Sequence, residues 1–126
     1  MQHIELIIEK GENGIWGRVS FNDNLITDEA NTLDELELKL KGLLNDFEGV
    51  DPESIEFDPK YDVFSLFDQF DFLNISKVAE HAGIHPGLLR QHASGVKHPS
   101  LNQAKKIEET LHRLADEMKK ASVYAA

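Results

Sequence analysis

Residues 75–95 have the sequence ISKVAEHAGIHPGLLRQHASG, which is the most informative segment for the fold of the C-terminal half. Asn74, directly before it, suits the cap of a first helix, and Gly83 suits the left-handed residue that ends one. Pro86 then fits the first turn of a second helix. Helices joined by so short a turn cross closely, which needs a small residue such as Ala79 in the first of them. The spacing therefore predicts a helix-turn-helix.

The second helix of this pair has an inward and an outward face. Ile84 follows the turn and Leu89 lies five residues further on, so both are expected to anchor the helix inward. In the major groove, arginine binds guanine O6 and N7, and glutamine binds adenine N6 and N7. Polar residues after the helix, with the N–H groups that open the next one, suit phosphate contacts. The predicted DNA-binding residues are His85, Gly87, Leu88, Arg90, Gln91, Ser94, Lys97, His98 and Ser100.

Further helices are predicted on both sides of this pair. Asp62 can cap a short helix from Val63 to Phe70, and Ser100 with Gln103 forms a capping box. Behind that box, apolar residues at helical spacing predict one buried stripe, at Leu101, Ala104, Ile107, Leu111, Leu114, Ala115 and Met118. Because a two-fold dimer reads two half-sites, we expect a homodimer on a palindromic operator. The long last helix and the Phe-rich segment 64–72 are the apolar surfaces that could form its interface or serve each chain's own core.

The N-terminal half has the patterns of short strands and one helix. Apolar residues alternate with polar ones as in half-buried strands, at residues 3–9 and 15–21 and, more briefly, at 25–27 and 54–57. Asn13-Gly14 favours the turn of a hairpin between the first two. Thr32 and Glu35 form a capping box, and Gly49 ends the helix that follows. That helix has one apolar stripe, formed by Leu33, Leu36, Leu40, Leu43, Leu44 and Phe47.

The predicted fold class is therefore α+β. Residues 1–62 would form a small ββ(β)αβ domain, with the helix laid on an antiparallel sheet, that binds a partner. Residues 63–126 would form an all-helical domain for DNA binding and dimerisation.

The charged residues are also distributed unequally between the N-terminal and C-terminal halves of the chain. The formal net charge is −10, but residues 1–72 hold 5 Lys and Arg against 18 Asp and Glu, whereas residues 73–126 hold 8 against 5. Such a split indicates one half that faces nucleic acid and another that faces something else. An acidic surface also keeps a protein in solution, and that alone would explain the first half.

Catalytic and cofactor sites are not predicted. Asp34, Glu35 and Glu37 lie in the first turns of a helix, where the dipole favours negative charge, and no acid–base partner stands beside them. Cysteine is absent, and the pair His81 and His85 straddles the turn, so we expect no metal site. The histidines of this region (His81, His85, His92 and His98) are expected at the surface or near phosphates. No apolar run could span a bilayer and no signal peptide is evident, so we expect a cytoplasmic protein.

The order of these parts resembles a HicB-type protein. The resemblance is carried by the strand hairpin, by the capped helix from Thr32 to Leu36, and by residues 75–84 leading into 89–95 and Pro99. It implies a degraded ribonuclease-H-like N-terminal domain and a dimeric helix-turn-helix domain. It also implies an antitoxin, which represses its own operon and occludes a basic, mRNA-cleaving toxin of the HicA type on its acidic half.

Three other interpretations remain open. The sequence departs from the family pattern at residues 22–25 and 30–31, in the half that would bind a toxin, so the chain could also be a solitary regulator without a toxin. A protein-binding module without DNA affinity and a metal-dependent, ribonuclease-H-like enzyme are further alternatives. We expect a regulator and no enzyme.

Overall fold

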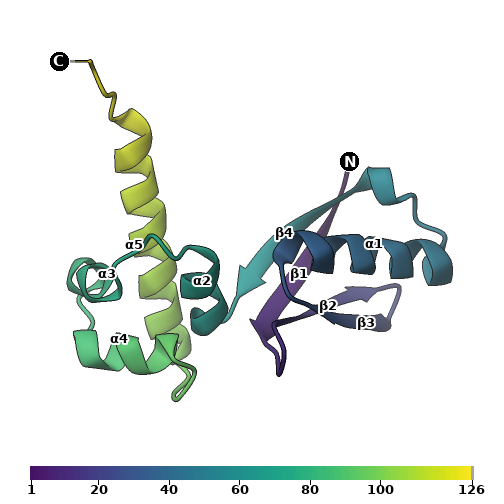
Figure 1. Cartoon of the computed structure of the whole chain (residues 1–126), viewed down its shortest axis with the longest axis horizontal. Coiled ribbons are helices and arrows are strands. Elements are labelled where there is room, and N and C mark those ends of the chain that lie inside the picture. The colour runs from purple at the N-terminus through teal and green to yellow at the C-terminus, as the bar shows by residue number, and fades with distance from the viewer. Residues whose placement is uncertain (126) are drawn as a thin grey trace. The chain divides into compact units, whose positions relative to one another are not determined.

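The computed structural model describes residues 1–125, which form two compact units. The first comprises Met1–Leu66 and the second Phe67–Ala126. All strands belong to the first unit, and helices α3, α4 and α5 belong to the second (Figure 1). The protein is α+β, with a mixed sheet of four strands, which confirms the predicted fold class.

The sheet has the strand order β3-β2-β1-β4. The central strand β1 (Gln2–Lys10) pairs antiparallel with β2 (Ile15–Phe21), which pairs antiparallel with β3 (Asn24–Ala30). On its other side β1 pairs in parallel with β4 (Ile55–Tyr61). The prediction of a wholly antiparallel sheet was therefore wrong. The chain crosses over through α1 (Leu33–Glu48) between β3 and β4, so β4 enters the sheet in the direction of β1.

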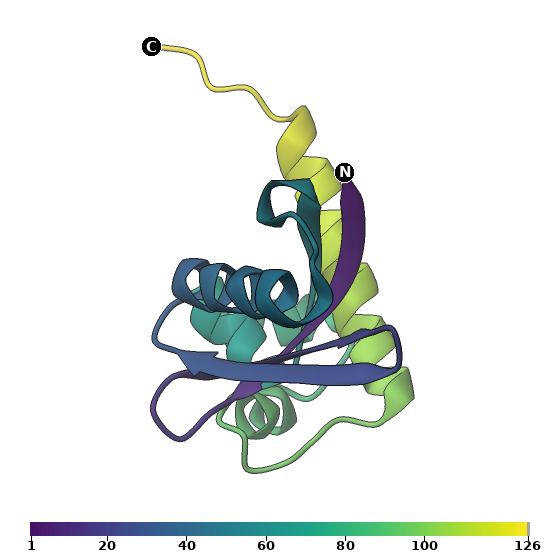
Figure 2. The same ribbon diagram turned by 90° about the vertical axis from the view of Figure 1, so that its right-hand side faces the viewer.

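The core of this unit lies between α1 and one face of the sheet (Figure 2). Leu36, Leu40 and Leu44 of α1 are completely buried, as predicted for their stripe. Gly17 of β2 lies directly beneath the helix, because a Cβ atom built there would come within 2.7 Å of Leu36 Cδ2. Phe47 was expected in the same stripe but is 74% exposed, so the stripe ends one turn earlier.

Local turns and caps set the bounds of these elements. Asn22 and Asp23 both have positive φ, at 48° and 63°, and join β2 to β3 as a two-residue hairpin turn. Because pairing with β2 begins directly after this turn, β3 is longer than the three residues predicted. Thr32 caps α1 by accepting the Glu35 N–H at 3.2 Å, whereas the Glu35 carboxylate accepts from Asn31 N–H rather than from Thr32. A 3₁₀ turn, Pro52–Ser54, leads into β4.

The helical unit is organised around α3 (Ile75–Ala82) and α4 (Pro86–Ala93). Asn74 caps α3 through the Lys77 N–H, and Gly83 ends it in the left-handed region, with φ of 68°. Ala79 of α3 and Leu89 of α4 are both completely buried, which allows the two helices to cross closely. Helix α2 (Val63–Gln69), capped by Asp62 as predicted, joins the units along the chain.

The last helix, α5 (Leu101–Lys120), is only partly covered by its own unit. Ile107 and Thr110 are its buried residues, and its C-terminal half extends past α3 and α4 in Figure 1. The predicted burial of the whole stripe was wrong, since Leu101 is 77% and Met118 60% exposed. The stripe is longer than the surface that α3 and α4 offer it.

Candidate nucleic-acid interface

The outward face of α4 is set by the burial of its inward face. Ile84 is 8% and Leu89 0% exposed, so these two residues fix the rotation of α4 against α3. Arg90 and Gln91 follow Leu89 and are exposed, whereas Gly87 and Leu88 are half-buried. A helix with a long cationic side chain and a neighbouring amide on its free face has the groups that recognise base edges in a major groove.

His85 begins this helix and is oriented by its own cap. Its Nδ1 atom accepts the Gly87 N–H at 3.1 Å, so in the neutral ring Nε2 carries the proton. The ring is exposed and lies at the N-terminal end of α4, where the helix dipole favours anions. His85 can thus donate from Nε2 to a phosphate while its other nitrogen stays in the cap.

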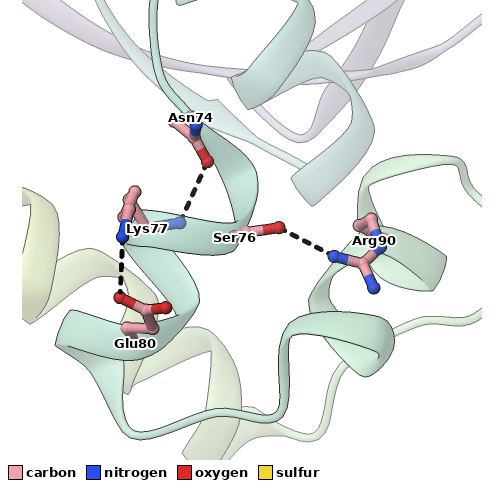
Figure 3. A network of polar contacts seen from close by, with 5 residues as sticks. All are labelled: Asn74, Ser76, Lys77, Glu80 and Arg90. Carbon is pink, nitrogen blue, oxygen red and sulfur yellow. Dashed lines mark hydrogen bonds and ion pairs between the residues drawn. The ribbon is translucent and has the colours of Figure 1, made fainter.

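Arg90 is held by a residue of the other helix. Its Nη1 atom donates to Ser76 Oγ at 2.7 Å, across the gap between α3 and α4 (Figure 3). Lys77 and Glu80 pair with each other at 3.5 Å, away from Arg90. Ser76 was not predicted from the sequence, because its bond to Arg90 joins side chains of two different helices. One bond to Ser76 leaves the other N–H groups of the guanidinium available for a ligand.

The loop after α4 folds back onto the end of that helix. The N–H groups of Val96 and Lys97 donate to the Gln91 carbonyl at 3.1 and 3.4 Å, and the Ser94 hydroxyl donates to the same carbonyl at 2.9 Å. The side chains of Ser94, Lys97 and His98 are exposed. These contacts place Lys97 next to Gln91, so a cationic side chain lies at the end of the polar face of α4.

Ser100 has a structural task in addition to the predicted one. Its hydroxyl accepts the Gln103 N–H at 3.2 Å, and Gln103 Oε1 accepts the Ser100 N–H at 3.3 Å. This complete capping box satisfies the N–H groups of Ser100 and Gln103 and leaves the Ser100 hydroxyl proton free to donate. The N–H groups of Leu101 and Asn102 precede the first intrahelical bond and remain suited to a phosphate oxygen.

His92 is the histidine that the structure places differently from the prediction. It is only 4% exposed, and neither ring nitrogen has a hydrogen-bond partner within residues 1–125. Burial lowers the pKa of His92, and the nearby His98 and Lys97 lower it further. The neutral ring therefore packs as an apolar group. It lies on the inner side of α4 because it follows Leu89 by three residues, and it cannot reach a phosphate.

The charge around this surface is predominantly positive. Between residues 74 and 106 the cationic side chains are Lys77, Arg90, Lys97, Lys105 and Lys106, and Glu80 is the one acidic residue. Glu80 pairs with Lys77, so it does not neutralise α4 or the loop after it. Within the described part of the chain, no three His, Asp or Glu side chains converge as a metal site would require.

The chain matches no known protein family, no curated protein and no solved structure. Among residues 1–125 no helix is both long enough and apolar enough to cross a membrane.

Proposed function

We propose that the chain is a sequence-specific DNA-binding regulator, in which α3 and α4 form a helix-turn-helix and α4 is the recognition helix. The observation that carries the proposal is the outward face of α4. It presents Arg90 and Gln91 beside the exposed Lys97, on a helix whose inner face is fixed by Leu89. Arginine and glutamine would read base edges, and Lys97, His98 and the start of α5 would hold phosphates.

A homodimer is the proposed active form. One recognition helix covers only a few base pairs, whereas two related by a dyad cover half-sites about 34 Å apart. The apolar positions Leu114, Ala115 and Met118 of α5 lie on one side of the helix and are not buried within the chain. Contact with the same helix of a second chain would bury the apolar residues of α5 that remain exposed in the single chain.

The acidic first unit supports a second activity, the antitoxin role that the resemblance to HicB-type proteins implies. Of the 18 acidic residues in the first 72 positions, most belong to this unit, which carries few compensating cations. Complementary charge accelerates association with a basic, RNA-binding toxin and disfavours other partners. In this proposal one chain represses its operon with its helical unit and occludes a toxin with its sheet unit. A solitary regulator would keep only the first activity.

Selection from a random duplex library tests the DNA assignment and requires no operator sequence to be chosen beforehand. The full-length protein should enrich a palindromic motif, with half-sites centred about one helical turn apart. Guanine and adenine should be over-represented at the positions that Arg90 and Gln91 reach. A library that stays random after repeated rounds at low salt would refute the regulator and favour the protein-binding module.

A nuclease is the remaining alternative, and it has a direct test. Incubation of the protein with single- and double-stranded nucleic acids and Mg²⁺ or Mn²⁺ should leave them intact. Cleavage that disappears when the exposed carboxylates of the first unit are neutralised would replace the regulator by an enzyme.

A further inference from the structure

We infer that the sheet face opposite α1 binds a basic protein segment and holds one of its long cationic side chains in a depression beside Glu5. The inference is independent of DNA binding, and it gives the second activity proposed above a defined surface. We refer to this surface as the open face, because α1 covers only the other side of the sheet (Figure 2).

Strand register defines which residues share the open face. Arg18 pairs with Ile7 on one side and with Thr27 on the other, and Glu9 and Glu29 flank Trp16 in the same way. In the parallel pair, Glu5 lies beside Asp58 and His3 beside Glu56. The open face thus comprises His3, Glu5, Ile7, Glu9, Trp16, Arg18, Ser20, Leu25, Thr27, Glu29, Glu56, Asp58 and Lys60.

Three apolar side chains, those of Trp16, Leu25 and Ile7, are spread over this face. Leu25 is 64% and Trp16 37% exposed, and Ile7 on the central strand between them and β4 is half-buried. A tryptophan and a leucine held on rigid strands can gain binding energy by losing contact with water, and tryptophan also attracts cations to its ring face.

The charges around these apolar residues select a basic occupant. Five carboxylates, those of Glu5, Glu9, Glu29, Glu56 and Asp58, face two cationic side chains, Arg18 and Lys60. Arg18 is already paired with Glu9 at 3.0 Å. His3 lies 3.1 Å from Asp58 and 3.6 Å from Glu56, and its pKa is raised, first by the hydrogen bond to Asp58 and then by both negative charges. The electrostatic potential around the open face is therefore negative.

A depression of about 180 Å³ opens on this face, lined by Glu5, Ile7, Arg18, Ser20 and Leu25. Ile7 and Leu25 supply apolar walls for a methylene chain, as the stems of Lys and Arg prefer. The Glu5 carboxylate makes no hydrogen bond or ion pair within residues 1–125, so it is available for a cationic head group. An apolar wall with a free carboxylate fits a lysine or arginine side chain better than an apolar or acidic one.

The same charges argue against other occupants. Nucleic acids and anionic lipid surfaces would be repelled by the five carboxylates. A second copy would bring together two faces that each carry more carboxylates than cations, which is unfavourable. The occupant is therefore a basic segment of a different protein.

Trp16 provides a readout on the open face, outside the depression itself, because it is the one tryptophan of the chain. Decaarginine is the probe and decaglutamate its charge-reversed control, each titrated into the full-length protein while Trp16 emission is recorded. Decaarginine should change the emission saturably, and decaglutamate should leave it unchanged. An absent or non-saturating response to decaarginine, or a response to decaglutamate, overturns the inference.

Matched variants separate a defined surface from general charge attraction. The double variant Glu5→Gln with Asp58→Asn removes two charges from the open face. Asp34→Asn with Asp46→Asn removes two exposed charges from α1 on the other side. The first pair should weaken decaarginine binding about threefold to thirtyfold, as expected for two exposed ion pairs, and the second less than about twofold. Equal weakening by both pairs overturns the inference.

Self-association is tested with the wild-type protein alone. If Trp16 emission changes with protein concentration in the absence of peptide, the occupant is a second copy and the inference fails. DNA binding is measured separately on the same samples, so loss of one activity is distinguishable from loss of the other.

Discussion

Arg90→Ala tests the assignment of α4 as the recognition helix most sharply. In the free protein the Arg90 side chain is exposed and makes one hydrogen bond, to Ser76 Oγ at 2.7 Å. Alanine is a better helix former than arginine and leaves no buried group unpaired. The free energy of unfolding should therefore change by less than about 0.5 kcal/mol, as is usual at exposed positions.

The effect on DNA should be far larger than the effect on stability. A bidentate arginine–guanine contact contributes about 1–3 kcal/mol of discrimination, so each half-site should lose about fivefold to 150-fold in affinity. The loss should be greatest for operators with guanine at the position that Arg90 reads, and the preference at that position should relax. Fluorescence anisotropy on the selected operator and on single-base variants measures both quantities.

Lys97→Ala is the matched comparison for this experiment. Lys97 lies in the loop beside Gln91 and is assigned to a phosphate. Its loss should weaken all duplexes to a similar degree and reduce the salt dependence by about one unit per protomer. Wild-type affinity and base preference in Arg90→Ala, or indistinguishable behaviour of the two variants, would contradict the assignment of α4 as the recognition helix.

Three further outcomes concern the stability of the two units. Gly17→Ala should cost about 1–3 kcal/mol in urea unfolding because its Cβ would press on the buried Leu36, and an unchanged midpoint would contradict the close approach of α1 to β2. Stability of the helical unit should fall below about pH 6.5, the ordinary pKa of histidine, because His92 has a lowered pKa and the unfolded chain takes up the proton first. His92→Leu should flatten that dependence in thermal melts, and an unaltered pH profile would show that another group is responsible. Asn74→Ala should cost about 1 kcal/mol through loss of the cap on Lys77 N–H, whereas Asn74→Ser, which can still cap, should cost little, and equal melting temperatures for both would contradict the capping role.

Local signals in the sequence predicted most of the elements. Ser100 with Gln103 and Asn74 before α3 are caps, and each works within four residues of its own position. Gly83 ends α3 with positive φ for the same local reason. Such features depend on hydrogen bonds between near neighbours, which a sequence displays directly.

Features that depend on distant partners were beyond the sequence. The parallel pairing of β4 with β1 joins strands about fifty residues apart, and no local turn sequence connects them to indicate it. Met118 is exposed because α3 and α4 do not extend along α5 as far as this residue. The apolar periodicity of α5 alone does not indicate where its neighbours end.

The candidate site shows the same limit. Burial of Ile84 and Leu89 was predictable from their spacing, and with it the outward position of Arg90. His92 was misassigned because histidine is usually a polar surface residue, although a position three residues after Leu89 faces the interior. Ser76 was missed because its bond to Arg90 crosses between two helices.

The proposed regulator binds a specific DNA sequence through α4 and the cationic loop after it. Fluorescence anisotropy on its own upstream DNA and on scrambled DNA of equal length, across a salt series, measures this binding. Specific recognition through α4 predicts tighter binding to the upstream DNA, and affinity that falls steeply as salt rises because counterions are released. Equal, negligible binding to both duplexes at low salt would contradict it.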